Sequence, residues 1–242
     1  ISDSWNFLKS RNINLAVQMC KLIKRMKIQK SIIEIHNRPY LTKLVKSKLH
    51  NHSINLFLHN NPLDMKGSKT IKERLVLLDC VDNIYCVSNF VKEKFLIGIN
   101  KNQKKVKVVY NGVKRRVKSE PLKKNNVIFV GRIVPEKGVD LFVKAIKLIY
   151  KDFLNWEFKL IGSKKLGSNS IDKFSKKILC DFDKIGKRTS ITGYINQDQL
   201  NNIMKKSSII IIPSTWEEPF GLVAAEAMSY GIAIIASNSG GL

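Results

Sequence analysis

The sequence predicts an α/β fold in which two Rossmann-like domains, each built on a parallel sheet, face a cleft. Short apolar stretches rich in β-branched residues alternate with stretches whose apolar residues recur at helical spacing. Polar residues follow the ends of the apolar stretches, as they do in βαβ units. One basic stretch without periodicity interrupts this alternation near the middle of the chain, and 242 residues are enough for two ordinary domains.

The first half begins with an amphipathic helix, expected over residues 12–27, in which apolar side chains recur every three or four positions. Pro39 favours the start of the next helix, because proline suits the first helical turn. The strands expected in this half are 31–36, 54–58, 83–87 and 106–110, and the helices between them are 38–49, 70–80 and 89–99. Strands that alternate with helices in this way form a parallel sheet.

The second half repeats the alternation. The expected strands are 127–130, 158–161, 190–192, 209–212 and 232–236, and the expected helices are 140–150, about 171–179, 199–205 and 220–230. The run Ile209-Ile210-Ile211-Ile212 is typical of a strand buried on both faces, which parallel sheets require. A second Rossmann-like domain follows from this pattern.

The stretch between the two halves is dense in lysine and arginine, contains Pro121 and lacks periodicity. We expect an N-terminal domain over residues 1–113, a linker over 114–125 and a C-terminal domain over 126–242. The sequence begins at Ile1 rather than at methionine and stops directly after an apparent strand. We therefore expect a portion of a longer protein, with the first domain incomplete at its start and the second at its end.

The net charge is +24 and comes mostly from lysines spread over nearly every segment. Neither an aromatic-interleaved basic patch nor a nucleic-acid-binding motif accompanies them, so we expect no nucleic-acid partner. An anionic membrane surface, an anionic acceptor and a lysine-rich bias of the source organism each account for the charge. No stretch has the length of a transmembrane helix, and we expect a cytoplasmic protein, with peripheral contact to the inner face of the membrane as one option.

The four cysteines lack any C-x-x-C spacing and lie among apolar residues. We expect buried free thiols in a reducing compartment rather than a zinc site. The cysteines are Cys20, Cys80, Cys86 and Cys180.

The segment that follows the apolar run 209–212 carries the densest set of candidate residues. Glu218 lies in the loop at the carboxyl end of that expected strand, and Glu226 lies inside the next helix. Open α/β sheets bind ligands at this edge, and free N–H groups at a helix start suit a phosphate. Each glutamate can accept hydrogen bonds from two sugar hydroxyls, which favours a nucleotide sugar. The alternative is that the acids merely cap the helix or complement its dipole.

A second segment lies at the carboxyl end of the first strand after the linker. Gly131 permits a tight turn, while Arg132 and Lys137 can converge on a diphosphate, the arginine as a fork and the lysine as a point charge. In a chain with 43 basic residues, two more in one loop also fit the overall composition.

The two segments together resemble the retaining GT-B glycosyltransferases of family 4. The first reads E-P-F-G-L-x-x-x-E-A-M from Glu218, and the second, about eighty residues earlier, reads G-R-x-x-x-E-K-G from Gly131. The resemblance implies a GT-B fold and the transfer of a hexose from a nucleotide-diphosphate sugar, with retention at the anomeric carbon. It also implies no cofactor and no required metal.

The resemblance also assigns roles to residues. Arg132 and Lys137 neutralise the departing diphosphate, Glu218 holds the hydroxyls of the donor sugar, and Glu226 holds the ribose. Backbone N–H groups around Phe220, Gly221 and Leu222 contact the phosphate and the sugar. A second loop contacts the base mainly through its main chain and consists of Gly193, Tyr194 and Ile195.

Two strand ends in the first half carry histidines. His59 follows strand 54–58, where similar enzymes place a histidine near the reacting carbon, although a turn-capping role is the alternative. His36, Asn37 and Arg38 end the preceding strand and resemble an H-N-R-P stretch of glycosyltransferases that act on bacterial surface polysaccharide or lipopolysaccharide. An acceptor-site role and a structural turn both remain open for this stretch.

The expected partners are a nucleotide sugar and a glycan or lipid-linked acceptor. Family members begin with a strand and a glycine-rich loop that this sequence lacks, and further C-terminal units are also missing. We therefore expect weak or absent transfer by this chain alone. The rival hypotheses are a basic, non-catalytic module that binds polyanions or membranes, and another GT-B enzyme such as a sugar-nucleotide epimerase.

Overall fold

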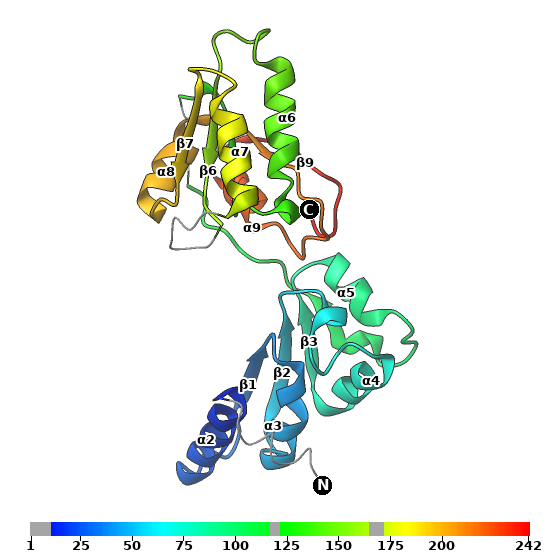
Figure 1. Ribbon diagram of the computed structural model, residues 1–242. Helices are drawn as coiled ribbons and strands as arrows, with labels where there is room; N and C mark the ends of the chain where they lie inside the picture. Colours follow the sequence, from blue (N-terminus) through cyan, green and yellow to red (C-terminus); the bar gives the residue numbers. More distant parts are fainter. Residues whose placement is uncertain (1–10, 117–121, 165–171) are drawn as a thin grey trace. The chain divides into compact units, whose positions relative to one another are not determined.

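The structure of the 242-residue chain is a computed structural model that describes residues 11–116, 122–164 and 172–242 (Figure 1). The chain divides into two compact units, Ile1–Tyr110 and Asn111–Leu242. Each unit is built on a parallel sheet. Over the described ranges, no helix combines the length and the apolar character needed to cross a membrane.

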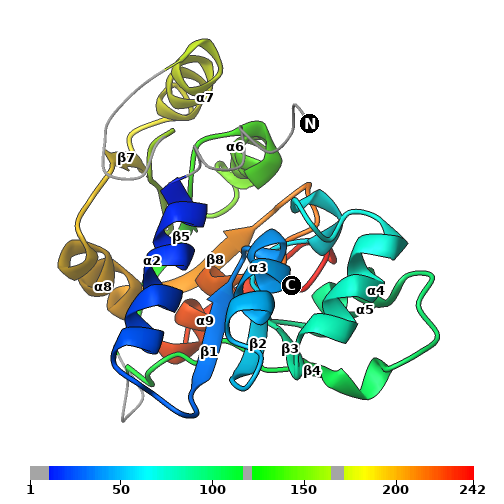
Figure 2. The same cartoon turned by 90° about the horizontal axis from the view of Figure 1, so that it is seen from below.

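Unit 1 contains a four-stranded sheet in the order β1-β2-β3-β4, and Figure 2 shows the strands side by side in this order. Its strands are β1 Ile32–His36, β2 Ser53–Leu58, β3 Asn83–Cys86 and β4 Val106–Val108. Its helices are α2 Arg11–Arg25, α3 Thr42–Lys48, α4 Ile71–Cys80 and α5 Asn89–Leu96, with short 3-10 turns at Pro39–Leu41, Pro62–Asp64 and Gln103–Lys105. Every neighbouring pair of strands is parallel, as the sequence pattern predicts.

The alternation of apolar and polar side chains along the strands determines which face of the unit 1 sheet is buried. Successive residues point to opposite faces of a sheet, and Ile33, Ile35, Ile54 and Leu56 are all buried on one of them. Right-handed connections between sequential parallel neighbours place their helices on that same face. Glu34, His36 and Phe57 belong to the other face, where Glu34 and His36 are exposed. The carboxyl ends of β1 and β2 therefore present polar and aromatic side chains.

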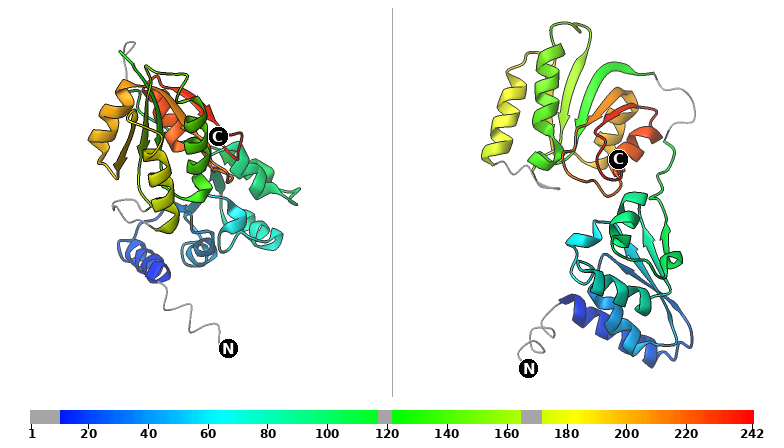
Figure 3. Two further views of the ribbon diagram at one scale, coloured as in Figure 1. Left: turned by 45° about the horizontal axis from the view of Figure 1, so that its top comes forward. Right: turned by 90° about the vertical axis from the view of Figure 1, so that its right-hand side faces the viewer.

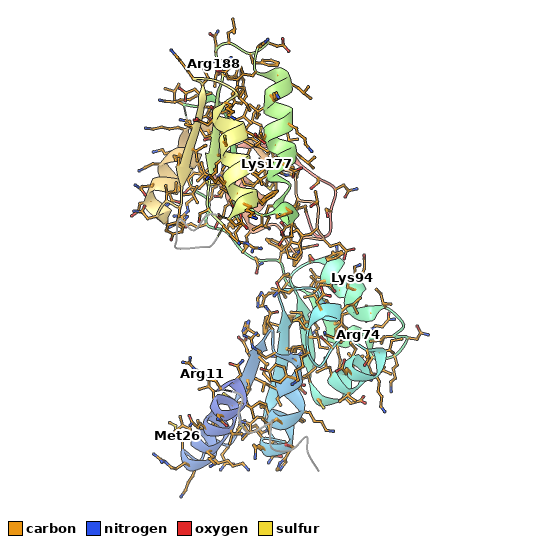
Figure 4. All side chains as sticks on the ribbon, in the orientation of Figure 1. Arg11, Met26, Arg74, Lys94, Lys177 and Arg188 are labelled. Carbon is orange, nitrogen blue, oxygen red and sulfur yellow. The ribbon has the colours of Figure 1, made fainter. Side chains whose placement is uncertain are left out.

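Among the described residues, Arg74 is the largest fully buried side chain, and it lies in α4 (Figure 4). Its guanidinium donates to the carbonyl oxygens of Ser68 (3.1 Å), Lys69 (2.8 Å) and Ile97 (2.7 Å). A buried arginine is costly unless it is hydrogen-bonded, and these three bonds from its terminal nitrogens join the start of α4 to the end of α5, while its buried Nε has no hydrogen-bond partner among the described residues. Thr70 and Glu73 add a capping box at the start of α4.

Unit 2 contains a five-stranded parallel sheet in the order β7-β6-β5-β8-β9. Its strands are β5 Lys124–Val130, β6 Glu157–Ile161, β7 Thr189–Gly193, β8 Ser207–Ile212 and β9 Ala233–Ala236. Its helices are α6 Val139–Ile149, α7 Lys173–Asp183, α8 Gln197–Lys206 and α9 Leu222–Ser229, with a 3-10 turn at Pro135–Lys137. The chain runs from β5 outward to β7, then returns to lie beside β5 as β8, so the strand order reverses between β5 and β8.

Helices cover both faces of the unit 2 sheet, as the right-hand view of Figure 3 shows. Val127 and Phe129 of β5 pack with Phe142 of α6 and Phe182 of α7. Ile128, on the opposite face of the same strand, packs with residues of α8 and α9. The continuous apolar runs of β5 and β8 are explained by this double burial.

Several details differ from the sequence-based expectations. Strand β5 begins at Lys124, inside the range assigned to the linker, and residues 117–121 of that range lie outside the described residues. Helix α7 begins at Lys173, and the expected start near residue 171 also lies outside them. The cysteine prediction was wrong in part, because Cys180 is exposed and Cys80 is half-buried, while Cys20 and Cys86 are buried.

Candidate functional site

Two loops of unit 2 leave the carboxyl edge of the sheet at the point where the strand order reverses. Residues 131–138 follow β5, and residues 213–221 follow β8, its neighbour in the sheet. Doubly wound sheets bind ligands in the crevice at this position, because the two connections leave in opposite directions there. Both sequence motifs therefore lie at the binding edge that the topology predicts.

Direct backbone contacts hold the two loops together. The Thr215 N–H donates to the carbonyl oxygen of Glu136 at 3.0 Å. Gly138 has a φ of +62°, and a Cβ atom placed on it would lie 1.8 Å from the carbonyl oxygen of Pro213. Only glycine permits both this left-handed conformation and this approach. The two loops therefore pack against each other through main-chain atoms.

An ion pair between Lys137 and Glu218 lies where these loops meet. The Lys137 ammonium donates to Oε1 of Glu218, and the Ser214 hydroxyl donates to the same oxygen at 2.7 Å. The Lys137 Nζ also lies 5.2 Å from the centroid of the Trp216 ring, within the range of a cation–π contact. The side chain of Glu218 is only 10% exposed, so water competes little for its oxygens.

The environment of Glu218 keeps its carboxylate ionised. Burial by itself raises the pKa of this group, but hydrogen bonds from Lys137, Ser214 and Trp216 outweigh burial and lower the pKa below its usual value. A carboxylate that accepts several hydrogen bonds is stabilised in its charged form. Glu218 is therefore an acceptor held in a fixed position.

Arg132 and Gly131 lie at the start of the loop after β5. Both are half-buried, and the Gly131 N–H donates to the carbonyl oxygen of Ile161 on β6 at 3.0 Å. Within the described part of the chain, no residue pairs with the Arg132 guanidinium. Its five donors are consequently available to a ligand at the same edge as Lys137.

The start of α9 differs from the expected one. The helix begins at Leu222, and Gly221 precedes it as the N-cap with a φ of +82°, whereas the sequence predicted a helix from Phe220 with Gly221 in its first turn. The left-handed conformation of Gly221 ends the loop and prevents an earlier start. The helix start still follows directly on the loop that carries Glu218.

Glu226 lies in the middle of α9 and is half-buried. Burial raises its pKa above the usual value, although the charge of Arg116 opposes this shift. The main chain of Arg116 is anchored beside it, because its N–H donates to the carbonyl oxygen of Ser229 at 3.0 Å. Glu226 is therefore a less strongly stabilised carboxylate than Glu218.

Tyr194 and Ile195 follow β7 at the same edge of the sheet. Tyr194 is 44% exposed, while Ile195 is half-buried and packs against the core on the α8 and α9 face. The carbonyl oxygen of Gly193 accepts a hydrogen bond from Gly162 N–H at 3.0 Å. This loop places main-chain groups and the aromatic ring of Tyr194 at the edge of the sheet.

The histidines of unit 1 are in direct contact. Nδ1 of His36 lies 2.9 Å from Nε2 of His59, and the ring of His36 stacks on Phe57 at a centroid distance of 4.6 Å. Asn37 has a φ of +52°, and its side-chain oxygen accepts from the His59 N–H at 2.8 Å. Arg38 donates to the carbonyl oxygen of Asn37. The structure thus brings together three of the four sequence-predicted residues of unit 1 at the ends of β1 and β2, with Arg38 beside them.

A cavity of about 210 Å³ adjoins His36. It lies between α2 and β1, and its lining combines apolar side chains with a few polar ones; they include Leu15, Met19, Ile33, Glu34, His36 and Arg38. Over the described ranges, no group of three or more histidine, cysteine or acidic residues is arranged to hold a metal ion.

Three residues of these sites were not identified from the sequence. Ser214 and Trp216 contact the Lys137–Glu218 pair, and Glu34 approaches His36. Ser214 and Trp216 flank the acidic segment, so their position was a signal. Glu34 lies two residues before His36 in a strand and therefore on the same face, which was a second signal.

Comparison with known proteins gives a family. The sequence profile described as glycosyl transferases group 1 matches residues 112–242. A glycosyltransferase of Methanocaldococcus jannaschii is 33% identical over 237 residues, which cover 91% of this chain and 62% of that protein. The lipopolysaccharide 1,2-N-acetylglucosaminetransferase of Salmonella typhimurium is 32% identical over 119 residues, covering 48% of this chain and 31% of that protein.

Solved structures confirm the predicted α/β fold class of the GT-B type. HepE of Anabaena in complex with UDP has a TM-score of 0.73 at 18% identity, covering 94% of this chain and 64% of that one. A glycosyltransferase from Rickettsia africae has a TM-score of 0.74 at 21% identity, covering 97% and 64%. The chain spans 62%, 43% and 56% of three of the curated relatives that it matches. With a profile match over more than half of its residues, the chain belongs to the glycosyl transferases group 1 family.

Proposed function

We propose that this chain supplies the nucleotide-sugar site of a retaining hexosyltransferase of family 4. The whole protein moves a hexose from a nucleotide-diphosphate sugar to a glycan or lipid-linked acceptor in the synthesis of surface polysaccharide or lipopolysaccharide. The observation that carries the proposal is the pairing of Lys137 with a buried, hydrogen-bonded Glu218 at the switch point of the unit 2 sheet. That arrangement places a cation for phosphate beside an acceptor for sugar hydroxyls.

In this proposal the donor is bound by groups of complementary chemistry. Arg132 and Lys137 neutralise the diphosphate, Glu218 accepts from hydroxyls of the sugar, and Glu226 accepts from the ribose. Backbone N–H groups at the start of α9 meet the phosphate and the sugar, and the loop after β7 contacts the base. The complex of HepE with UDP, a protein with the same fold, supports this choice of ligand class.

The proposed reaction breaks the bond between the anomeric carbon and the diphosphate oxygen, and forms a bond from that carbon to the acceptor oxygen on the same face. The bond electrons leave with the diphosphate, and the acceptor proton moves to the departing phosphate oxygen. Arg132 and Lys137 stabilise the charge that develops there, which is electrostatic catalysis by preorganised groups. Because these cations supply the charge, the proposal includes neither a metal nor another cofactor, and it predicts that the whole protein transfers sugar in the presence of a chelator.

The acceptor side is assigned to unit 1. We place the acceptor near His36, Asn37 and Arg38, with His59 as a hydrogen-bonding group for the reacting sugar. The cavity beside His36 is lined by leucine, methionine and isoleucine as well as by Arg38, a combination that suits the apolar and anionic parts of a lipid-linked acceptor. A net charge of +24 would also hold the protein at an anionic membrane surface in the cytoplasm.

Calorimetric titration with UDP, GDP and ADP tests the donor site. We expect this chain to bind one nucleotide selectively, and we expect both Glu226→Ala and the double variant Arg132→Ala/Lys137→Ala to weaken that binding. Loss of a hydrogen bond to a charged group corresponds to a decrease in affinity of about tenfold or more. Lys144→Ala is the matched control, because Lys144 is an exposed lysine of α6 paired with Asp140.

Equal binding of all three nucleotides that disappears with added salt and is unchanged in the variants would overturn the proposal. Such behaviour would mean that the net charge attracts any polyanion, as a basic binding module does. Vesicles with and without anionic lipid, sedimented with the protein, test the membrane contact separately. Binding to neutral and anionic vesicles alike would contradict that part.

A further inference from the structure

The histidine pair of unit 1 is held rigidly from several sides. Parallel pairing of β1 and β2 sets His36 opposite Phe57, so that His59 follows two residues beyond on the same face. The ring of His36 stacks on Phe57 with the planes 11° apart, and Phe57 in turn packs on Tyr85 of β3. Asn37 fixes the main chain of His59 from the other side. Both imidazoles therefore have fixed orientations.

The contact between the two rings contains a single hydrogen. Nδ1 of His36 and Nε2 of His59 are 2.9 Å apart, and a hydrogen bond at that distance requires one nitrogen to donate and the other to accept. Two neutral arrangements satisfy this requirement. Either His36 donates through Nδ1, or His59 donates through Nε2.

Glu34 selects between the two arrangements. Its carboxylate oxygen Oε2 lies 3.5 Å from Nε2, the far nitrogen of His36. A carboxylate attracts a nitrogen that carries hydrogen and repels one that presents a lone pair, so Nε2 of His36 is the protonated nitrogen. Nδ1 of His36 is then the acceptor, and His59 donates to it through Nε2. The remaining nitrogen of His59, Nδ1, carries a lone pair.

The local environment agrees with a neutral His59. The side chain is half-buried, and burial together with the neighbouring His36 lowers the pKa of His59. Among the residues that the structure describes, none forms a hydrogen bond with Nδ1 of His59. This nitrogen is therefore available to a ligand.

We propose that Glu34 and His36 are positioning residues that hold His59 in the tautomer protonated at Nε2, so that its Nδ1 lone pair accepts a hydrogen bond from a ligand hydroxyl. No covalent step and no net proton transfer is involved. The identity of the hydroxyl, a sugar hydroxyl, rests on the proposed function; the tautomer and its two positioning residues do not.

Histidine nitrogen NMR tests the tautomer directly. In chain labelled with ¹⁵N-histidine, long-range ¹H–¹⁵N spectra distinguish protonated from unprotonated ring nitrogens, and the His59→Gln variant identifies the His59 signals by their loss. We expect wild-type His59 to show a protonated Nε2 in about tenfold or greater excess over the other tautomer, as one hydrogen bond to a charge-oriented partner provides. A His59 protonated mainly at Nδ1 would overturn the proposal.

Matched variants separate the hydrogen bond from ring stacking. His36→Phe retains the stack on Phe57 but has no ring nitrogen, so we expect the excess of the Nε2-protonated tautomer of His59 to fall to the smaller preference of a free histidine side chain. His36→Asn places an amide oxygen near the former Nδ1 and should restore the Nε2 tautomer. Glu34→Gln, which removes only the charge, should shift the tautomer ratio of His59 toward that of a free histidine side chain. Exposed His50 provides the control, because His50→Phe should leave His59 unchanged.

The outcomes also separate this inference from the proposed function. An unchanged His59 tautomer in His36→Phe would refute the positioning role, whatever the nucleotide titrations show. The expected tautomer pattern together with non-selective nucleotide binding would refute the proposed function alone. Backbone ¹H–¹⁵N spectra report whether each variant folds, and His36→Asn provides a second test if His36→Phe does not.

Discussion

Lys137 and Glu218 form an ion pair although 81 positions separate them in the sequence. Each residue lies in a loop that leaves the carboxyl edge of the unit 2 sheet, one after β5 and the other after β8. The ammonium that is assigned to the donor diphosphate is therefore paired with a carboxylate of the protein itself. A bound diphosphate must share Lys137 with Glu218.

This competition predicts an increase in affinity when the carboxylate is neutralised. Glu218→Gln removes the charge that competes for Lys137, so we expect the selected nucleoside diphosphate to bind roughly fivefold more tightly, the equivalent of about 1 kcal/mol. Binding of the complete nucleotide sugar should weaken, since the glutamine is a poorer acceptor for the sugar hydroxyls. Calorimetry with both ligands measures the two effects.

Glu217→Gln is the control for this prediction. Glu217 is exposed and adjacent in sequence, so its variant changes the net charge by the same amount. Equal gains in affinity for both variants would show that net charge, rather than release of Lys137, is responsible.

The two glutamates predict opposite dependences of stability on pH. The folded-state pKa of Glu218 lies below its usual value of 4.5, so its stabilising contribution is complete above pH 4.5 and is lost as the pH falls through the lowered pKa. The folded-state pKa of Glu226 lies above 4.5, so its contribution is present below pH 4.5 and is lost as the pH rises through the raised pKa.

Glutamine variants make this difference measurable. At pH 7 we expect Glu218→Gln to lower the free energy of unfolding of unit 2 and Glu226→Gln to raise it. Below pH 4.5 the effect of Glu226→Gln should disappear, and the effect of Glu218→Gln should shrink as the pH falls further. Urea unfolding followed by tryptophan fluorescence reports unit 2 in a Trp5→Phe background, because the two other tryptophans, Trp156 and Trp216, belong to that unit. Changes of the same sign at pH 7 would contradict the assignment of the two environments.

Arg74 predicts a large loss of stability in unit 1. In Arg74→Leu the carbonyl oxygens of Ser68, Lys69 and Ile97 lose their donor inside the protein, and each unsatisfied group costs about 1–3 kcal/mol. We expect unit 1 to lose at least about 3 kcal/mol, measured by hydrogen exchange of the β2 and β3 amides. The exposed Arg38 is the control, and Arg38→Leu should stay within about 0.5 kcal/mol of wild type.

The cysteines predict two classes of thiol reactivity. Burial raises the pKa of Cys86 to about 12, so its thiol is neither ionised nor accessible at pH 8. Cys180 is exposed on α7 and should react rapidly with a disulfide reagent under native conditions. We expect Cys86 to react only on unfolding in urea. Rapid modification of Cys86 in the folded protein, located by mass spectrometry, would contradict its position in the core.

The sequence was sufficient for the sheets and for the position of the motifs, because alternation and helical spacing are local properties. The continuous run from Ile209 to Ile212 predicts a doubly buried strand, and the residues after such a strand must lie at its carboxyl edge. The contact between Lys137 and Glu218 is different in kind. It depends on β8 lying next to β5, a choice of strand order that no local pattern specifies.

Local conformation accounts for the smaller errors. The apolar run from Phe220 predicts a helix, but the left-handed conformation of Gly221 delays its start to Leu222. Cys180 lies among apolar neighbours in the sequence, yet Ile178 and Phe182 of the same helix face the core while Cys180 points away. A composition-based prediction of burial cannot distinguish neighbours on opposite sides of an amphipathic helix.

The close approach of Gly138 to the Pro213 carbonyl sets the distance between the two loops of the site. Because a methyl group there would overlap the Pro213 carbonyl, we expect the Gly138→Ala substitution to push the two loops apart. Every charged side chain of the site would remain present, but Lys137 and Glu218 would lie too far apart to form their ion pair. Such a variant would show whether ligand binding depends on the distance between these groups or only on their presence.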